Sequence, residues 1–236
     1  MYILAFDTCL GAVSVAVARA DAGGVSVLLE RSERRHAGHA ERLLPLIMEA
    51  LEELNLTFAV IGRIAVTRGP GSFTGVRTGI AAARALALAI GCPAVGVDCL
   101  TAIAWQARAQ LGARSAERPL AVALDARLGL VYFQLFDAAG ATLTPALLLP
   151  AATCAERLGR APTVVVGSAA ALVAAAADAV GGHAEAHLTE AEPSAGVVAR
   201  LGVTLACEGP LKPLYLRAPD VKPQSGHVLP RIEPQC

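Results

Sequence analysis

The amino-acid sequence predicts an α/β protein built from two lobes that repeat one order of elements, β-β-β-α-β-α. Two meanders of short strands support this prediction, one starting at residue 2 and the other at residue 120. In each meander the first strand ends in an aspartate, Asp7 or Asp125. In the first half, a glycine-rich turn at 68–79 also separates a strand from a helix rich in alanine and leucine. Two whole meanders seldom arise by chance, so we infer an internal duplication.

The first half of the chain contains an amphipathic segment followed by a β-α-β pattern. Apolar residues recur every three or four positions across residues 36–54, which predicts an amphipathic helix, and Pro45 predicts a kink or a second start within it. The strand, helix and strand within 63–98 should form a right-handed, parallel β-α-β unit. In order, we expect strands at 2–7, 13–18 and 25–30, a helix at 36–54, a strand at 63–67, a helix at 76–90, a strand at 94–98 and a helix at 101–117.

The second half repeats this order on a weaker pattern. We expect strands at 120–125, 130–136 and 143–149, a helix at 151–158, a strand at 163–167, a helix at 169–180, a loop at 181–193 and a closing helix at 194–207 with Ser194 as its N-cap. The tail at 211–236 has five prolines and no regular period, so we expect it to wrap around the protein or to be mobile. The expected units are a first lobe at 1–104, a second lobe at 105–192, and a segment at 193–236 that packs back on the first lobe.

Composition narrows the function. The 20 Lys and Arg residues balance the 20 Asp and Glu residues, which argues against a protein that binds nucleic acid by itself, and the 55% of hydrophobic residues favours self-association or a partner. The cysteines at 9, 92, 99, 154, 207 and 236 form no C-x-x-C pair, which indicates reduced thiols in the cytoplasm. The apolar runs are interrupted, the longest helical one by Arg84, so we expect no membrane span and a soluble protein.

The glycine-rich turn has the sequence R-G-P-G-S-F-T-G-V-R-T-G and allows two interpretations. Glycines let the backbone approach a ligand, and the free N–H groups of a helix start suit a phosphate. No lysine follows Gly75, however, and the G-x-G-x-x-G spacing is absent, so neither common phosphate-binding motif fits. The alternative is a tight strand-to-helix turn whose glycines serve packing alone.

Further motifs carry a resemblance to a known family. They are D-T at 7–8, H-x-x-H-A-E-x-L-L-P-L-I at 36–47, G-P-G-S-F-T-G-V-R-T-G at 69–79, D-A-R at 125–127 and P-L-Y-L-R at 213–217. Together they resemble the bacterial TsaB (YeaZ) family of the actin-like, sugar-kinase-like superfamily, whose lobes are ribonuclease-H-like. The resemblance covers nearly the whole chain, and the string at 69–79 is long and specific.

This resemblance implies a non-catalytic subunit of the machinery that makes N6-threonylcarbamoyladenosine (t6A) beside the anticodon of tRNAs that read codons starting with A. The implied partners are TsaD, which transfers the threonylcarbamoyl group, and the ATPase TsaE, reached through the TsaB–TsaD complex. A homodimer is a further expectation, and tRNA is expected only through the complex. No cofactor of its own is implied; ATP, threonylcarbamoyl-adenylate (supplied by TsaC or its relative) and a metal are expected in the partner subunit.

The prediction that this chain binds no metal of its own depends mainly on one segment. TsaD-like chains carry two metal-binding histidines after the strand that follows the glycine-turn helix, whereas Cys99 and Ile103 occupy those positions here. Isoleucine cannot bind a metal and one cysteine makes a poor site, so we expect none. His36 and His39 lack further ligands nearby, and His183 and His187 fall in an expected exposed loop. No Ser/His/Asp or Cys/His grouping supports a protease.

The sequence analysis therefore predicts two sites and no catalytic residue. The expected partner interface is His36, His39, Glu41, Leu43, Leu44, Ile47, Leu51, Val76 and Ile80. The expected vestigial nucleotide cleft is Asp7, Thr8, Gly69, Pro70, Gly71, Ser72, Thr74, Gly75, Arg77 and Asp125. Two alternatives stay open: the apolar stripe of the helix at 36–54 packs on its own sheet, and the aspartates only cap strand ends.

Two other functions compete with the scaffold hypothesis. An independent ATP-dependent phosphotransferase would use Asp7, the glycine-rich turn and Asp125, but the sequence offers no plausible catalytic base. Direct tRNA binding is disfavoured by the zero net charge.

Overall fold

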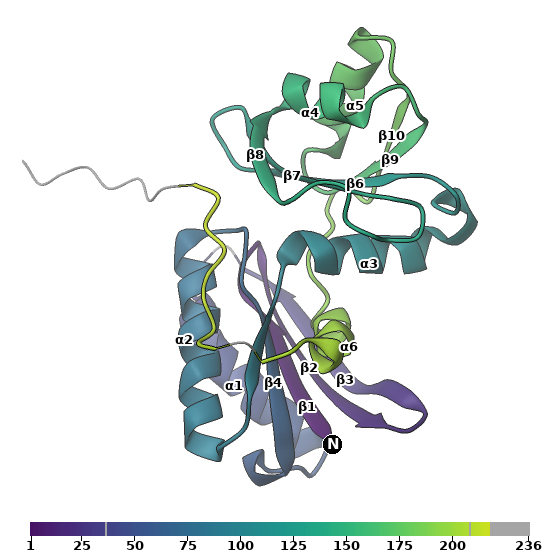
Figure 1. Ribbon diagram of the computed structural model, residues 1–236. Helices are drawn as coiled ribbons and strands as arrows, with labels where there is room; N and C mark the ends of the chain where they lie inside the picture. Colours follow the sequence, from purple (N-terminus) through teal and green to yellow (C-terminus); the bar gives the residue numbers. More distant parts are fainter. Residues whose placement is uncertain (36, 208, 218–236) are drawn as a thin grey trace, which may run out of the picture.

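Two five-stranded sheets form two lobes, stacked one above the other with helix α3 between them (Figure 1). The computed structural model describes residues 1–35, 37–207 and 209–217. The first sheet has the order β3-β2-β1-β4-β5 and the second the order β10-β9-β6-β7-β8. The strands are β1 Tyr2–Asp7, β2 Ala12–Asp21, β3 Gly24–Arg34, β4 Ile61–Thr67, β5 Ala94–Val97, β6 Leu120–Asp125, β7 Leu130–Phe136, β8 Leu147–Pro150, β9 Thr163–Val166 and β10 Ala184–His187.

The two sheets have the same topology. In each, the first strand pairs antiparallel with the second and parallel with the fourth, while the third and fifth strands form the edges. β1 and β6 thus hold equivalent central positions, and Asp7 and Asp125 both end their strands. The predicted duplicated α/β fold is confirmed.

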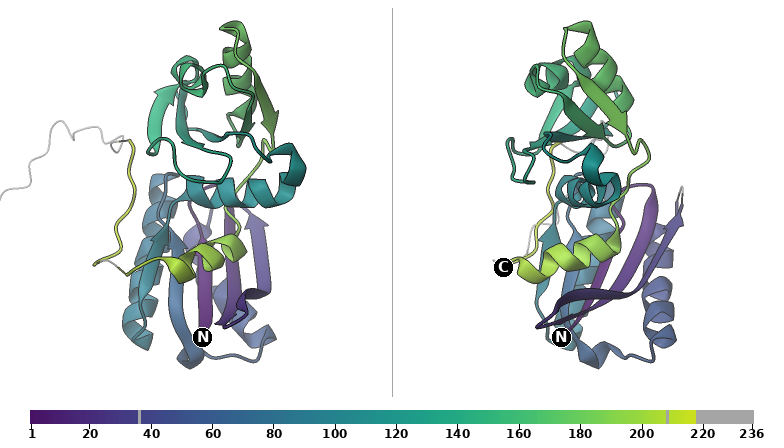
Figure 2. Two further views of the ribbon diagram at one scale, coloured as in Figure 1. Left: turned by 45° about the vertical axis from the view of Figure 1, so that its right-hand side comes forward. Right: turned by 90° about the vertical axis from the view of Figure 1, so that its right-hand side faces the viewer.

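Helices cover both faces of the first sheet. The helices of the described chain are α1 His39–Glu53, α2 Phe73–Ile90, α3 Cys99–Leu111, α4 Ala151–Leu158, α5 Ala170–Ala179 and α6 Ala195–Thr204, with short 3₁₀ turns η1 Phe58–Val60 and η2 Gly112–Arg114, and α1, α2 and α6 are those that cover the first sheet. Leu4 and Phe6 of β1 pack with α1 in one core, whereas Ile3 and Ala5 pack with α6 in another. Figures 1 and 2 show α6 crossing the face opposite α1. Side chains alternate along a strand, so a central strand covered on both faces must be apolar throughout.

Helix α3 joins the lobes. Leu100, Ile103 and Ala107 pack against the second sheet, whereas Ala102 belongs to the core of the first sheet and α6. The expected lobe boundary at 104 and 105 therefore falls inside α3. The opposite face of the second sheet packs against α4 and α5.

Several element boundaries differ from the sequence predictions. A second helix start at Pro45 is wrong, because one helix runs through it from His39 to Glu53. The third strand of the second meander is only β8, Leu147–Pro150, and the stretch at 181–193 is not a plain loop, since it contains β10. The first-lobe hairpin is longer than expected because β2 and β3 pair over their whole lengths.

Within the described residues, α2 alone has the length and apolar composition of a membrane-spanning helix. It nevertheless packs on the first sheet, with Val76, Ile80 and Ala83 among its buried residues.

Candidate functional site

A cleft of about 1220 Å³ opens between the lobes, on the side where the glycine-rich turn leads into α2. Its lining combines the turn with residues 9–11 of the first lobe, residues 124–127 and 189–192, and the tail at 214–217. Residues predicted for the nucleotide cleft that line it are Pro70, Gly71, Ser72, Thr74, Gly75, Arg77 and Asp125. Asp7, Thr8 and Gly69 were predicted with them but do not line it, because they are buried behind its wall.

The glycines let the turn pack closely against the β1–β2 connection. A Cβ on Gly71 would lie 2.3 Å from the carbonyl oxygen of Cys9, and one on Gly75 would lie 2.0 Å from that of Thr8. The backbone N–H of Ser72 donates to the Cys9 carbonyl at 2.7 Å, and the Ser72 hydroxyl caps α2 by accepting from the Gly75 N–H at 3.1 Å. Two donors of the turn are therefore already used inside the chain, which favours the packing interpretation of these glycines.

The tail crosses the turn as a strap, defined as residues 211–217. The N–H of Leu214 donates to the Arg68 carbonyl at 2.7 Å, and the Tyr215 ring stacks on Phe73 with 4.4 Å between centroids. The Arg77 guanidinium lies 4.1 Å from the centroid of the Phe73 ring and donates to the Tyr215 hydroxyl at 3.1 Å. Figure 1 shows the strap in yellow, running beside α2 towards the second lobe. The expectation that the tail wraps the protein thus holds for residues 211–217; residues 218–236 lie outside the described part.

Behind the turn, Asp7 belongs to a buried polar cluster. Its Oδ1 accepts from the Cys9 N–H at 3.1 Å and from the Thr67 hydroxyl, whereas its Oδ2 is buried without a hydrogen-bond partner. Burial raises the pKa of Asp7 to about 6, against the hydrogen bonds from Thr67 and Cys9 that lower it. The Cys9 sulfur lies 3.2 Å from the Thr67 hydroxyl oxygen. Asp7 is thus shielded from both solvent and the cleft in this conformation.

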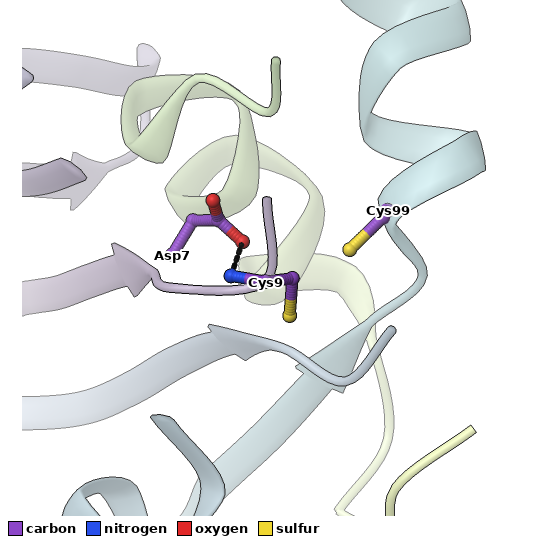
Figure 3. Close-up of side chains that lie close together, drawn as sticks. All are labelled: Asp7, Cys9 and Cys99. Atoms are coloured by element: carbon purple, nitrogen blue, oxygen red, sulfur yellow. Dashed lines mark hydrogen bonds between the residues drawn. The ribbon is translucent and has the colours of Figure 1, made fainter. Parts of the chain in front are cut away.

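Cys99 completes the cluster from the start of α3. The ligand atoms of Asp7, Cys9 and Cys99 all lie within 4.8 Å of one another, and the Cys99 sulfur points towards the other two residues (Figure 3). Burial raises the pKa of the Cys99 thiol well above its usual range, and the neighbouring Cys9 raises it further. The sequence analysis considered Cys99 alone and missed Cys9 and Thr67, because no spacing rule connects positions so far apart in the chain.

Asp125, the counterpart of Asp7, is exposed at the cleft. Its Oδ1 accepts from the Arg127 N–H at 2.8 Å, and its own N–H donates to the Ser168 hydroxyl at 2.9 Å. These bonds hold the turn after β6, as the alternative interpretation of the aspartates expects. Asp7 and Asp125 therefore do not face each other as an equivalent pair of ligands.

Most residues of the predicted partner interface are not available to a partner. Leu43, Ile47 and Leu51 are buried in the core between α1 and the sheet, and Val76 and Ile80 of α2 are also buried. The prediction is wrong for these five side chains, because the apolar stripe of each helix faces the chain's own core.

The remaining interface residues divide between two places. His39 and Glu41 line the interlobe cleft, and His36 lies outside the described residues. Leu44 is exposed on α1, as are Met48 on the same helix and Leu88 on α2, both of which the sequence analysis missed. His183 precedes β10, and His187, at its end, lies 3.5 Å from Glu185.

Comparison with known proteins identifies the family. The model of the TsaD family, tRNA N6-adenosine threonylcarbamoyltransferase, matches residues 29–179. The TsaB protein of Escherichia coli K12 is 41% identical over 133 residues, which cover 56% of this chain and 54% of that protein. The chain belongs to the TsaB family. The solved structure of YeaZ from Pseudomonas aeruginosa is similar to this chain, with a TM-score of 0.70 and 28% identity over 91% of this chain and 99% of that one.

The similarity extends through both lobes. An uncharacterized protein of Mycobacterium tuberculosis H37Rv is 36% identical over 229 residues, which cover 94% of each chain. The TsaB relative of Escherichia coli is named for tRNA threonylcarbamoyladenosine biosynthesis.

Proposed function

We propose that this chain takes part in t6A biosynthesis as a non-catalytic subunit that binds TsaD through the outer surfaces of α1 and α2. The observation that carries the proposal is the apolar surface of these helices, which we call the α1–α2 face and define as Leu44, Met48 and Leu88. Their exposed fractions are 47%, 61% and 86%. Leu44 and Met48 lie one turn apart and so share one side of α1, and apolar side chains that gather on a surface mark interaction sites.

The similarity between this chain and TsaD indicates what kind of surface the partner presents. The TsaD family model matches this chain across α1 and α2, so TsaD should carry related helices at equivalent positions. Two related helix pairs can pack face to face around a pseudo-twofold axis, as in an isologous dimer. The same geometry allows a homodimer in the absence of TsaD, and TsaE would join through the complex.

The cleft supports the non-catalytic part of the proposal. Asp7 is buried, the strap crosses the glycine-rich turn, and Asp125 holds its own turn. An independent phosphotransferase needs a carboxylate that reaches nucleotide and Mg²⁺ in the cleft, which Asp7 does not do in this conformation. We therefore assign ATP, threonylcarbamoyl-adenylate and the catalytic metal to the TsaD side, and tRNA contact to the complex.

The test is a double substitution on the α1–α2 face, Met48→Glu with Leu88→Glu. Each charge would lie in an apolar interface without a partner, so we expect loss of co-elution with TsaD on size exclusion and loss of t6A in a strain that lacks its own TsaB. The matched control is Leu172→Glu on α5, which is 55% exposed in the second lobe and should leave both unchanged. Full t6A synthesis by a double variant that no longer binds TsaD would overturn the scaffold role.

A further inference from the structure

Three potential metal ligands converge behind the glycine-rich turn from separate parts of the fold. Asp7 ends β1, Cys9 lies in the connection to β2, and Cys99 is the first residue of α3. Their ligand atoms lie within 4.8 Å of one another, and all three residues are fully buried. Figure 3 shows the Cys99 sulfur directed from the helix start towards Cys9 and Asp7. Within the described residues this is the one grouping of its kind.

A second observation points to a cation at the cluster. Asp7 Oδ2 is buried and has no hydrogen-bond partner, and none of the ion pairs among the described residues includes Asp7. A buried carboxyl group without a counter-charge is costly, and a cation held between this group and the two sulfurs would supply the missing charge. Asp7 Oδ1 is meanwhile held by the Cys9 N–H and the Thr67 hydroxyl, which resembles the outer hydrogen bonds that orient metal ligands.

We propose that Asp7, Cys9 and Cys99 form a zinc-binding site. Two sulfur ligands disfavour Mg²⁺ and Ca²⁺, which prefer oxygen, whereas Zn²⁺ accepts a mixture of thiolate and carboxylate. With Zn–S distances of about 2.3 Å and Zn–O distances of about 2.1 Å, tetrahedral ligand atoms lie roughly 3.5–4 Å apart, within the spread that the cluster allows. Zinc binding displaces the two thiol protons to solvent. Cys9 borders the cleft, so a fourth ligand would have to come from that side.

The site would brace the junction of the two lobes. The N–H of Cys99 donates to the Gly69 carbonyl at 2.8 Å, and the Cys9 carbonyl accepts from the Ser72 N–H at 2.7 Å. Ligands to one ion would therefore connect the end of β1, the β1–β2 connection and the start of α3, and these two hydrogen bonds join the glycine-rich turn to them. Ile103 packs between α3 and the second sheet and is not a ligand. The proposed site therefore differs from the two-histidine metal site of TsaD-like chains.

The test uses the full-length reduced chain without an affinity tag, in a background in which Cys92, Cys207 and Cys236 are serine. Zn²⁺ alone is the probe, measured by competition with a chromophoric chelator, and Co²⁺ replaces it in a parallel titration. We expect one Zn²⁺ per chain, a thiolate-to-cobalt charge-transfer band, and the visible bands of tetrahedral Co²⁺. Because the cobalt spectrum reports thiolate binding without altering a ligand, it remains informative where a variant fails to fold.

Substitutions then locate the site. Cys9→Ser and Cys99→Ser should each weaken zinc binding at least about 10-fold, whereas Cys154→Ser, a buried cysteine of α4, should leave it unchanged. Absence of zinc binding by the reduced chain, or zinc binding retained in both ligand variants, would overturn the proposal. A Cys9–Cys99 disulfide formed on mild oxidation, without zinc uptake by the reduced chain, would identify a redox pair and overturn it too. The measurements use the chain alone, so their failure leaves the proposed TsaD binding untouched.

Discussion

The two lobes share one topology but differ in how the equivalent central strands end. In the first lobe Asp7 is fully buried, a long glycine-rich turn folds over it, and the strap closes that turn from outside. In the second lobe Asp125 is exposed. The residues after β9 form only a short turn, in which Gly167 packs against the Ala123 carbonyl. The duplication has therefore kept the strand order, which the core requires, while the strand ends have diverged. The first lobe holds the polar cluster, and the second presents a simple capped turn.

The largest expected effect tests whether the first-lobe turn depends on its close packing. Gly75→Ala places a Cβ 2.0 Å from the Thr8 carbonyl oxygen in a buried contact between backbones, so it should lower the free energy of unfolding by about 3 kcal/mol or more. Gly140→Ala in the second lobe is the control, because its φ of +90° is unfavourable for alanine but no atom lies within 4 Å of the new Cβ. It should cost about 1 kcal/mol, measured by urea unfolding. Equal losses would show that the turn relaxes easily.

The second prediction distinguishes Asp7 from Asp125 by the pH dependence of the free energy of unfolding. The pKa of Asp7 rises from 3.8 to about 6 on folding, so the folded chain binds more protons than the unfolded chain between these values. Stability from this group is complete below pH 3.8 and falls as the pH rises through about 6, by at most about 3 kcal/mol.

Asp7→Asn should remove this pH dependence. Asparagine keeps the shape and one acceptor oxygen but cannot ionise, so with a chelator present it should stabilise the chain by about 2–3 kcal/mol at pH 8 and by only about 0.5 kcal/mol at pH 4. Asp125→Asn should change stability by less than about 0.5 kcal/mol at either pH. Chemical unfolding at a series of pH values provides the measurement. A difference between wild type and Asp7→Asn that does not vary with pH would contradict the raised pKa.

The sequence predicted the duplicated topology because the spacing of hydrophobic residues and the positions of turn residues indicate each helix and strand from its own segment of the chain. It missed β10, since Ala184–His187 has no β-branched residue and becomes a strand through its pairing with β9. Amphipathicity revealed that one face of α1 is buried but not what covers it. Leu43 and Ile47 were therefore assigned to a partner, although the chain's own sheet covers them. The cluster escaped prediction because β1 and α3 bring Cys9 and Cys99 together only in the folded chain.

The smallest effect concerns the strap, which only the first-lobe turn carries. Tyr215→Ala removes the stacking on Phe73 and the hydrogen bond from Arg77, so it should lower stability by about 1 kcal/mol, as aromatic pairs do. Leu143→Ala, an exposed apolar residue of the second lobe, is the matched control and should cost less than about 0.5 kcal/mol. Limited proteolysis with trypsin adds a local readout, because a strap freed from Phe73 should be cut after Arg217 faster than in the wild type, without faster cleavage elsewhere. Unchanged cleavage would mean that the backbone hydrogen bond of Leu214 and the hydrogen bond from the Arg217 guanidinium to the Ala126 carbonyl hold the strap without the ring. The closed first-lobe turn would then depend on these two hydrogen bonds and not on the aromatic pair.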